Sequence, residues 1–275
     1  MPGPNRPCPL QAVEHPDAMA LAAPAPRIIL ITGANRGLGR LIAERLATPD
    51  HVLLLACRDV AAGRRVAEAL RPLCRSCFVL KLDITRRATI EQLGLRIAKR
   101  YGLLHGLVNN AGIFLHPEDL TIASLSWDGL VSTLQTNLLG PFWLLKCLRP
   151  LLQKADSACV VNVTSDMAEP ETCIGDYSAY RMSKAGLNSF TFNLAAALKP
   201  EGILVNGIDP GWIPTDMGGP EATDDLNLAA ALAARCVQLP PGGLSGKIFR
   251  AVNLSSEADI DQLIGTASLA VPDGR

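Results

Sequence analysis

The amino-acid sequence predicts an α/β fold: a doubly wound parallel sheet of about seven strands in a single domain. Short apolar runs alternate with longer segments of helical periodicity from Arg27 onward. The runs are apolar throughout rather than at every second position, as expected for strands that helices cover on both faces of a sheet. No internal repeat and no second core is visible in the sequence, so we expect one domain over residues 27–250.

The predicted strands are the short apolar runs, and the predicted helices are the periodic segments between them. Strands are expected at 27–32, 52–57, 77–82, 105–110, 158–164 and 203–208, with 246–249 as a weaker seventh candidate. Helices are expected at 37–47, 60–71, 86–101, 126–153 and 177–199. Ligands of such a fold bind at the carboxyl ends of the strands.

Three segments fall outside this alternation. Residues 1–26 contain seven prolines and little periodicity, which predicts a flexible extension. Residues 217–244 begin and end in Gly/Pro clusters around a short apolar helix expected near 225–237. We interpret them as a lid-like segment over the site, with a surface excursion as the alternative. Residues 251–275 form a tail with a weak helical pattern and no assignable role.

Composition excludes several classes of protein. Apolar residues make up 48% of the chain, which is enough for a substantial core and inconsistent with global disorder. The 26 basic and 26 acidic side chains cancel, so neither a nucleic acid nor a membrane surface is an expected partner. The short basic block Arg64-Arg65 is interpreted as a solvated helix face.

The eight cysteines are scattered, which fits reduced thiols in a cytoplasmic protein. The C-x-x-C motif at 74–77 has no second pair, so no metal site is expected. The sequence contains no apolar run long enough to span a membrane, and we recognise no signal peptide at its start.

A tyrosine and a lysine with useful chemistry lie in the predicted helix 177–199. Tyr180 and Lys184 stand four residues apart, so both side chains lie on one helix face. A neighbouring ammonium favours the phenolate, and we expect it to lower the pKa of Tyr180 from its usual value of about 10. Such a tyrosine can exchange a proton with a substrate, although a solvated helix face is the alternative for this motif alone. Tyr177 is a rival, but its partner at four residues is Arg181, which is too basic for a proton relay.

A glycine-rich turn stands between the first predicted strand and the first predicted helix. It would let the backbone turn tightly at Gly33, approach a ligand at Gly37, and pack helix against strand at Gly39. The N-terminus of the helix would offer free N–H groups to a pyrophosphate. We therefore expect a Rossmann-type dinucleotide site, with these residues at the cofactor: Gly33, Asn35, Arg36, Gly37, Leu38 and Gly39.

The end of the second predicted strand indicates which dinucleotide binds. NAD-binding proteins usually place Asp or Glu there to accept the ribose 2′-hydroxyl, but this strand ends in Arg58. Arg58 and Arg36 could clamp a 2′-phosphate, which carboxylates would repel. Asp59 is interpreted as the N-cap of the next helix. NADP is the predicted cofactor, with NADPH preferred over NADH.

Seven motifs follow one another in the order of a known family. They are T-G-x-x-x-G-x-G at 32–39, Leu82-Asp83-Ile84, Asn109-Asn110-Ala111-Gly112, Asn137, Ser165, Tyr180-x-x-x-Lys184 and Asp209-Pro210-Gly211. Together they resemble the single-domain short-chain dehydrogenase/reductase family over roughly residues 27–250. The segments 179–185 and 210–219 resemble those of C-factor and sniffer-type carbonyl reductases.

The resemblance implies a role for each matched residue. Tyr180 would protonate a carbonyl oxygen or deprotonate an alcohol, and Lys184 would hold the nicotinamide ribose. Ser165 would hydrogen-bond the substrate oxygen, and Asn137 would hold a water that links Lys184 to solvent. The other implied cofactor residues are Asp83 and Asn110 at the adenosine half, Ile84, Ala111 and Gly112 nearby, and Pro210, Gly211, Ile213 and Thr215 near the nicotinamide and phosphates.

Three of these positions have other readings. Asn137 could pin a helix bend, and Asp83 could cap a turn. The hydroxyl that faces the site could belong to Thr164 or Ser165, depending on the register of the strand, and the family pattern favours Ser165. Asn109 is expected to be structural.

The sequence therefore predicts an NADP-dependent oxidoreductase that interconverts a ketone or aldehyde and the corresponding alcohol by hydride transfer. An NADP(H)-binding sensor or scaffold without turnover is the alternative, although such proteins often lose the tyrosine or the lysine. A nucleotide-sugar epimerase or dehydratase fits the glycine spacing less well.

The expected substrate is a small, largely apolar carbonyl or alcohol. The loop 166–179 is longer than the family's commonest spacing and acidic, so the substrate is not inferred by analogy. The lid candidates are apolar: Trp212, Ile213, Met217, Leu226, Leu228 and Leu232. The predicted helices 126–153 and 177–199 could form the face of a homodimer.

Overall fold

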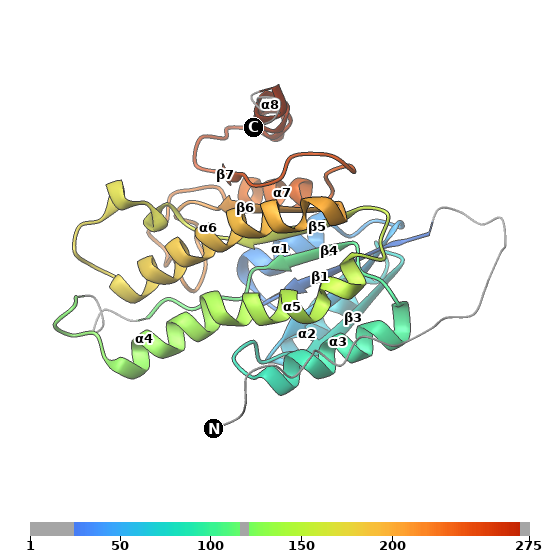
Figure 1. The fold of residues 1–275 in the computed structure, drawn as a ribbon, viewed down its shortest axis with the longest axis horizontal. Helices are drawn as coiled ribbons and strands as arrows, with labels where there is room; N and C mark the ends of the chain where they lie inside the picture. The colour runs from blue at the N-terminus through green and yellow to red at the C-terminus, as the bar shows by residue number, and fades with distance from the viewer. Residues whose placement is uncertain (1–24, 116–120, 270–275) are drawn as a thin grey trace.

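The computed structural model describes residues 25–115 and 121–269, so the extension expected at 1–26 lies outside the described residues except for its last two. Within this range seven parallel strands form one sheet, in the order β3-β2-β1-β4-β5-β6-β7 (Figure 1). The strands are β1 (Arg27–Thr32), β2 (His51–Cys57), β3 (Ser76–Lys81), β4 (Gly106–Asn109), β5 (Ala158–Val163), β6 (Ile203–Asp209) and β7 (Ile248–Arg250). The predicted doubly wound sheet is confirmed. Strands are added toward one edge from β1 to β3 and toward the other edge from β4 to β7, so the strand order reverses between β1 and β4.

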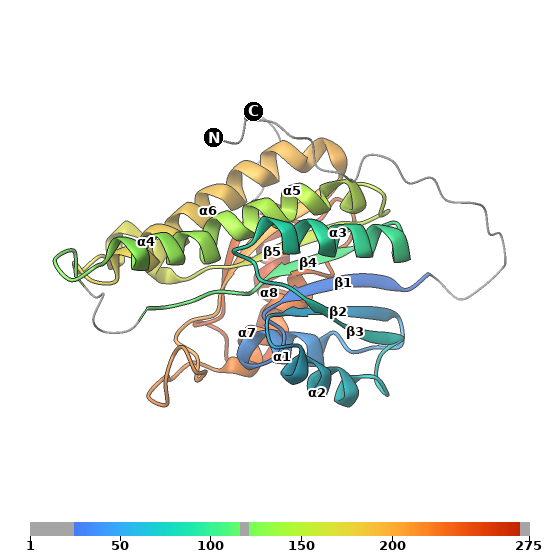
Figure 2. The same ribbon diagram turned by 90° about the horizontal axis from the view of Figure 1, so that it is seen from below.

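Helices cover both faces of this sheet (Figure 2). One layer contains α1 (Gly37–Arg45), α2 (Val60–Leu70) and α7 (Leu226–Cys236), with α8 (Glu257–Leu269) packed on α7. The other contains α3 (Arg87–Tyr101), α4 (Trp127–Leu134), α5 (Gly140–Leu152) and α6 (Ser178–Leu198).

Each face of the sheet has its own hydrophobic core. In β1, Ile29 and Ile31 pack under the α1 layer, whereas Ile28 and Leu30 pack under the α3 layer. Side chains alternate between the two faces of a strand, so a strand covered on both faces must be apolar at successive positions. This is why the strands of this chain read as continuous apolar runs.

The predicted helix 126–153 is interrupted. A π-helical turn, η2 (Gln135–Leu139), separates α4 from α5. At the start of α5, a Cβ on Gly140 would lie 2.7 Å from the main-chain oxygen of Ile84. The glycine therefore lets this helix approach the loop after β3, and the extra residue of the π turn changes which side chains face the sheet.

The interpretation of residues 217–244 as a lid does not hold for the helix in this segment, α7, which is buried in the core. Every residue from Ala229 to Ala234 is buried, and Leu232 is part of the core under α1. A helix that is apolar on all sides belongs in a core, and it cannot swing away without exposing that surface. Only the loop before α7 reaches the site, so Leu226, Leu228 and Leu232 do not line it.

The tail expected after residue 250 has a structural role. Ile260 of α8 is buried, and Leu254, Leu263 and Ile264 pack against the same core as α7. Residues 251–266 therefore cover the outer side of α7. None of the helices in the described ranges is both long and apolar enough to cross a bilayer.

Candidate active site

A cavity of about 1220 Å³ opens at the carboxyl edge of the sheet. Loops that follow all seven strands line it, from β1 to β7. All the predicted site residues line this cavity except Asn137: Gly33, Asn35, Arg36, Gly37, Leu38, Gly39, Arg58, Asp83, Ile84, Asn110, Ala111, Gly112, Ser165, Tyr180, Lys184, Pro210, Gly211, Ile213 and Thr215. Its size exceeds that of most single-ligand pockets, which fits a dinucleotide and a second molecule together.

The glycine turn after β1 has the backbone geometry that the sequence predicted. Gly33 and Gly37 have positive φ angles of 66° and 52°, which side chains rarely adopt. A Cβ on Gly39 would lie 2.5 Å from the main-chain oxygen of Gly33. Arg36 occupies the N-cap of α1 without a side-chain cap, so no side chain of the cap satisfies the first N–H groups of the helix. These features fit an anionic group bound at this helix end.

Two side chains hold the glycine turn against β4. The Thr32 hydroxyl accepts hydrogen bonds from the main-chain N–H groups of Asn110 at 3.0 Å and Ala111 at 2.9 Å. Asn110 Nδ2 donates to the main-chain oxygen of Thr32 at 2.8 Å. The Asn110 Nδ2 is therefore engaged with the turn. Thr32 opens the glycine motif but is not among the predicted site residues.

Three arginines surround the end of the cavity beyond β2. Arg36 and Arg58 lie there as predicted, and Arg65 of α2 joins them. Arg64 and Arg65 are both exposed, as predicted for a solvated helix face, and Arg65 also lines the cavity. Arg36 Nη1 is 2.6 Å from Asp216 Oδ2, in an exposed ion pair with the loop after β6.

Two aspartates near this end cap local structure. Asp59 accepts a hydrogen bond from the N–H of Ala62 at 2.9 Å, which confirms its predicted N-cap role for α2. Asp83 accepts hydrogen bonds from the N–H and the hydroxyl of Thr85, at 3.1 and 2.7 Å. Asp83 therefore caps a turn and lines the cavity at the same time.

Asn137 lies in the π turn, 1% exposed, and its side-chain amide is fully engaged. Its Oδ1 accepts from the N–H of Ile113, and its Nδ2 donates to the main-chain oxygen of Ile113, both at 2.9 Å. Nδ2 also donates to the Ser183 hydroxyl at 3.1 Å. The amide therefore ties the loop after β4 to α6, which is a structural role other than the helix bend considered from the sequence. The side chain has no donor left for a water.

Tyr180 and Lys184 lie on one face of α6 and both line the cavity. The Lys184 ammonium lies 5.4 Å from the centroid of the Tyr180 ring and donates to the main-chain oxygen of Val163 at 2.8 Å. Burial lowers the pKa of Lys184 to about 8, and the carboxylate of Asp209 acts in the opposite direction.

The expected fall in the pKa of Tyr180 is wrong for this structure. Burial raises the pKa of Tyr180, and the charge of Asp209 raises it further. A hydrogen bond with Ser165 acts in the opposite direction but is smaller than these effects. The phenol is therefore in its protonated form at neutral pH.

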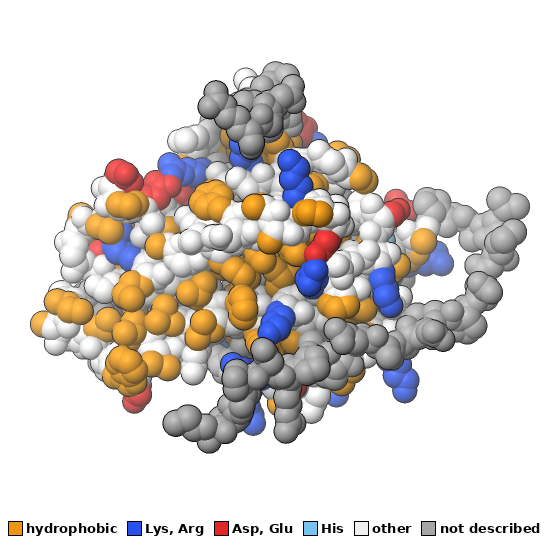
Figure 3. All heavy atoms as spheres, in the orientation of Figure 1, with side chains coloured by type: hydrophobic (Ala, Val, Ile, Leu, Met, Phe, Trp, Pro, Cys, Tyr) orange, Lys and Arg blue, Asp and Glu red, His pale blue; other side chains and the backbone are white. Residues whose placement is uncertain are grey.

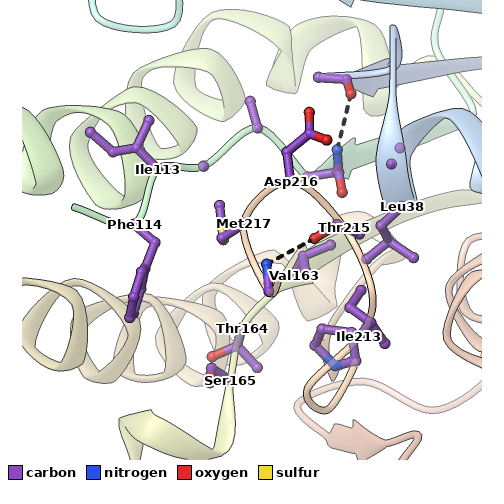
Figure 4. Close-up of a pocket in the computed structure, with 18 of the residues that line it drawn as sticks. Leu38, Ile113, Phe114, Val163, Thr164, Ser165, Ile213, Thr215, Asp216 and Met217 are labelled. Carbon is purple, nitrogen blue, oxygen red and sulfur yellow. Dashed lines mark hydrogen bonds between the residues drawn. The ribbon is translucent and has the colours of Figure 1, made fainter. Parts of the chain in front are cut away.

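The hydroxyl at the end of β5 that faces the cavity belongs to Ser165. Thr164 is 1% exposed and donates to the side-chain oxygen of Asn188, so its hydroxyl is already used. The Ser165 hydroxyl donates to Asp166 Oδ1 at 3.0 Å and accepts from the N–H of Met167 at 3.2 Å. Both residues are drawn at the foot of the cavity in Figure 4.

An aromatic wall stands beside Tyr180. The ring centroid of Phe114 is 4.7 Å from that of Tyr180, edge to face, and 4.6 Å from that of Tyr177. Tyr177 has a φ of +47°, alone among the described non-glycine residues. The residue four positions after Tyr177 is Arg181, so no lysine lies one helical turn from Tyr177. Arg181 pairs with Asp176 at 2.8 Å.

The loop after β6 covers the cavity from the other side. The Thr215 hydroxyl accepts from the N–H of Gly218 at 3.2 Å (Figure 4). Trp212 Nε1 donates to the main-chain oxygen of Gly218 at 2.8 Å. The carboxylate of Asp224 accepts from the N–H of Trp212 at 2.6 Å. The loop is thus folded on itself before a ligand arrives, and it presents Met217 to the cavity.

Metal chemistry finds no support in the described residues. Within 25–115 and 121–269, no three His, Cys, Asp or Glu side chains are grouped closely enough to hold a metal ion. The cysteines of the C-x-x-C motif, Cys74 and Cys77, are free and buried. Burial raises the pKa of both thiols, that of Cys77 to about 12, so neither is a reactive thiolate.

The chain is similar to known proteins over most of its length. Residues 27–226 match the family described as short chain dehydrogenase. The chain is 31% identical over 220 residues to the 3-oxoacyl-[acyl-carrier-protein] reductase FabG of Escherichia coli, covering 80% of this chain and 84% of that protein.

Two solved structures are similar to this one in fold and sequence. The carbonyl reductase Sniffer of D. melanogaster superimposes with a TM-score of 0.73 at 29% identity, covering 82% of this chain and 97% of that one. The NADPH-bound carbonyl reductase from chicken fatty liver gives 0.72 at 25% identity, with the same coverage of 82% and 97%. The chain therefore belongs to the short-chain dehydrogenase/reductase family of oxidoreductases, with carbonyl reductases among its structural relatives.

Proposed function

We propose that this protein is an NADP-dependent oxidoreductase that interconverts a ketone or aldehyde and the corresponding alcohol. One observation carries the proposal: Tyr180 and Lys184 share one helix face inside the same cavity as the glycine turn. A proton donor and a dinucleotide-binding turn are the two parts that hydride transfer to a carbonyl needs.

The residues present fit NADP. The uncapped N-terminus of α1 and the two glycines with positive φ would hold the pyrophosphate. Arg36, Arg58 and Arg65 would hold the 2′-phosphate, since guanidinium groups pair with phosphate in two-point geometry. A carboxylate that could accept a ribose 2′-hydroxyl does not follow β2 at position 58. The chicken carbonyl reductase with the same fold is NADPH-bound, which supports this preference.

The chain's own groups divide the chemistry. When bound, NADPH supplies the hydride. Tyr180 gives its proton to the substrate oxygen, and the Ser165 hydroxyl would turn from Asp166 Oδ1 to donate a hydrogen bond to the same oxygen. Lys184 provides a positive charge beside the phenol. Since the Asn137 amide is engaged, a water that links Lys184 to solvent would have to bind its main-chain oxygen.

The walls of the cavity favour a largely apolar substrate. Ile113, Phe114, Met167, Trp212 and Met217 line the end of the cavity that contains Tyr180. At the mouth, the carboxylate of Glu169 pairs with Arg250, which removes both charges from the apolar lining. We propose a carbonyl compound with an apolar body, in a cytoplasmic enzyme.

The decisive test is turnover of NADPH with a panel of apolar ketones and aldehydes, compared with the variant Tyr180→Phe. The variant should lose at least about a hundredfold in kcat, because general acid catalysis contributes factors of this size. Its affinity for NADPH, measured by fluorescence titration, should remain. Tyr177→Phe is the matched control, since Tyr177 lines the same cavity without a neighbouring lysine. Full activity in Tyr180→Phe would refute the mechanism, and NADPH binding without turnover of any substrate would favour the sensor alternative.

A homodimer is also proposed. Apolar side chains at the surface of η2, α5 and α6 are exposed: Leu139, Phe142, Met182 and Phe192. Figure 3 shows a broad apolar area over the helices on this face of the molecule. Exposed apolar groups that gather over two neighbouring helices are typical of an interface.

A further inference from the structure

Asp209 is the last residue of β6, and its carboxylate is buried at the cavity. The residue is 2% exposed and lines the cavity together with Tyr180 and Lys184. One carboxylate oxygen accepts a hydrogen bond from the N–H of Gly211 at 3.0 Å. Burial raises the pKa of Asp209, whereas hydrogen bonds from the N–H groups of Gly211 and Asp166 act in the opposite direction. N–H groups do not neutralise a charge, and a buried carboxylate is costly unless a positive charge compensates it.

Two positive charges lie near Asp209 in the topology. Arg250 stands opposite Asp209 in the register of β6 and β7 but pairs with Glu169, which leaves Lys184. Val163 of β5 lies opposite Ile208 of β6, and Asp209 follows Ile208. The Lys184 ammonium donates to the main-chain oxygen of Val163 at 2.8 Å. The ammonium and the carboxylate therefore lie at the ends of adjacent strands. The ion pairs within the described residues do not include Lys184, so the two charges interact across the cavity without direct contact.

We propose that Asp209 is a positioning residue for the reaction, whose charge acts on the Tyr180–Lys184 pair from the end of the neighbouring strand. This inference deepens the proposed function and rests on it. A negative charge at this place stabilises the ammonium of Lys184 and opposes a phenolate at Tyr180. Asp209 acts in this direction on both groups: it adds to the rise in the pKa of Tyr180 and opposes the fall in the pKa of Lys184 that burial causes.

The consequence concerns the direction of the reaction. A tyrosine that stays protonated can give its proton to a carbonyl oxygen, which is what reduction requires. Alcohol oxidation requires the phenolate, which the carboxylate of Asp209 disfavours. The site is therefore arranged for reduction at neutral pH, and oxidation should need alkaline conditions.

The other charges around the pair are more exposed than Asp209. Asp166 of η3 (Asp166–Ala168) also raises the pKa of Tyr180, but it is the last of the causes and its side chain is exposed. Asp224 of the loop after β6 acts on Asp209 itself and is tied to the N–H of Trp212. Glu169 pairs with Arg250 at the mouth. Solvent screens exposed charges more than buried ones, so Asp209 should dominate.

A purely structural role for Asp209 is the competing explanation, and one substitution separates the two. Gly211 has a φ of +75°, and the carboxylate of Asp209 could serve only to hold this turn. Asp209→Asn keeps an oxygen acceptor for the N–H of Gly211 and removes the charge. Asp209→Ser also keeps an acceptor and replaces it if the asparagine variant does not fold.

The first test is a spectroscopic titration that needs no turnover. The chain contains three tyrosines, so the tyrosinate absorbance of Tyr180 can be assigned by subtracting the curve of Tyr180→Phe. In Asp209→Asn the Tyr180 signal should appear at a pH about one unit lower than in the wild type, the size expected for removing one charge near a buried group. Asp166→Asn should shift it less, and Glu169→Gln should leave it in place. Superimposable curves for Asp209→Asn and wild type would overturn the proposal.

The second test is the pH profile of NADPH-dependent carbonyl reduction. The alkaline limb of kcat should move to lower pH in Asp209→Asn, because Tyr180 loses its proton earlier. A rate that falls by the same factor at every pH, with an unmoved limb, would show a structural role and contradict the inference. Since the titration is independent of activity, a failure of the proposed function and a failure of this inference give different results.

Discussion

At the scale of single residues, charge and burial decide the chemistry more than residue type does. The pair Tyr180 and Lys184 is visible in the sequence, but the direction of the tyrosine's pKa shift is not. Burial and the carboxylate of Asp209 raise the pKa of Tyr180, although an ammonium lies one helical turn away. The spacing along α6 shows that Tyr180 and Lys184 lie on one face. Asp209, the third charged or titratable group, comes from the end of β6, which the spacing does not reveal.

Arg58 is the residue whose replacement tests the cofactor preference. Arg58→Asp should raise the dissociation constant of NADPH at least about tenfold, because it removes a charged hydrogen-bond donor and adds a charge that repels phosphate. NADH, which has no 2′-phosphate, should be affected less. The measurement is a fluorescence titration with both cofactors.

Arg64→Asp is the matched control for this experiment. Arg64 is exposed on α2, one residue before Arg65, and does not line the cavity. It should change the affinity for either cofactor little. If Arg58→Asp weakened NADPH and NADH equally, the assignment of this end of the cavity to a 2′-phosphate would be refuted.

At the scale of elements, periodicity identifies helices but not their surroundings. The short apolar helix after the Gly/Pro cluster was expected on the correct residues, and α7 runs over Leu226–Cys236. Its place in the core rather than over the site follows from packing against α1, which lies far away in sequence. A π turn within the segment 126–153 was likewise not predictable, because Asn137 bonds to the loop after β4 and to α6.

Leu232→Ala tests whether α7 belongs to the core. Leu232 is completely buried, so its truncation should lower the free energy of unfolding by about 2–5 kcal/mol, measured by urea denaturation. The same substitution at Leu95, which is 42% exposed on α3, is the control and should cost much less. A lid helix would behave in the opposite way, with little loss of stability and a change in KM for the substrate.

At the scale of the whole molecule, the strand order assembles the site. The crossover from β3 back to β4 on the other side of β1 places the glycine turn beside the loop after β4. The next crossovers bring β5 and β6 alongside, with Ser165 and Asp209 at their ends. Segments more than a hundred residues apart thereby share one cavity, as expected at a switch point of an open α/β sheet.

The apolar face over α5 and α6 predicts the oligomeric state. Light scattering of the purified protein should give twice the mass of one chain, because burying Phe142 and Phe192 against a second copy removes apolar surface from water. Phe192→Lys should shift the protein toward the monomer without unfolding it, since this side chain is already 48% exposed. A single-chain mass for the wild type at every concentration would contradict the proposed homodimer.

The sequence by itself determined the order and type of the strands, the glycine turn and the positions of Ser165, Tyr180 and Lys184. These follow from local properties: the repeat of apolar residues, the φ angles that only glycine adopts easily, and helical spacing. Only the tertiary structure decided that α7 is a core helix, that Arg65 faces the cavity, and that Asp209 acts on Tyr180. Each of these depends on contacts between segments that the strand order brings together. Local patterns in the sequence do not show which distant segments will be in contact in the folded sheet.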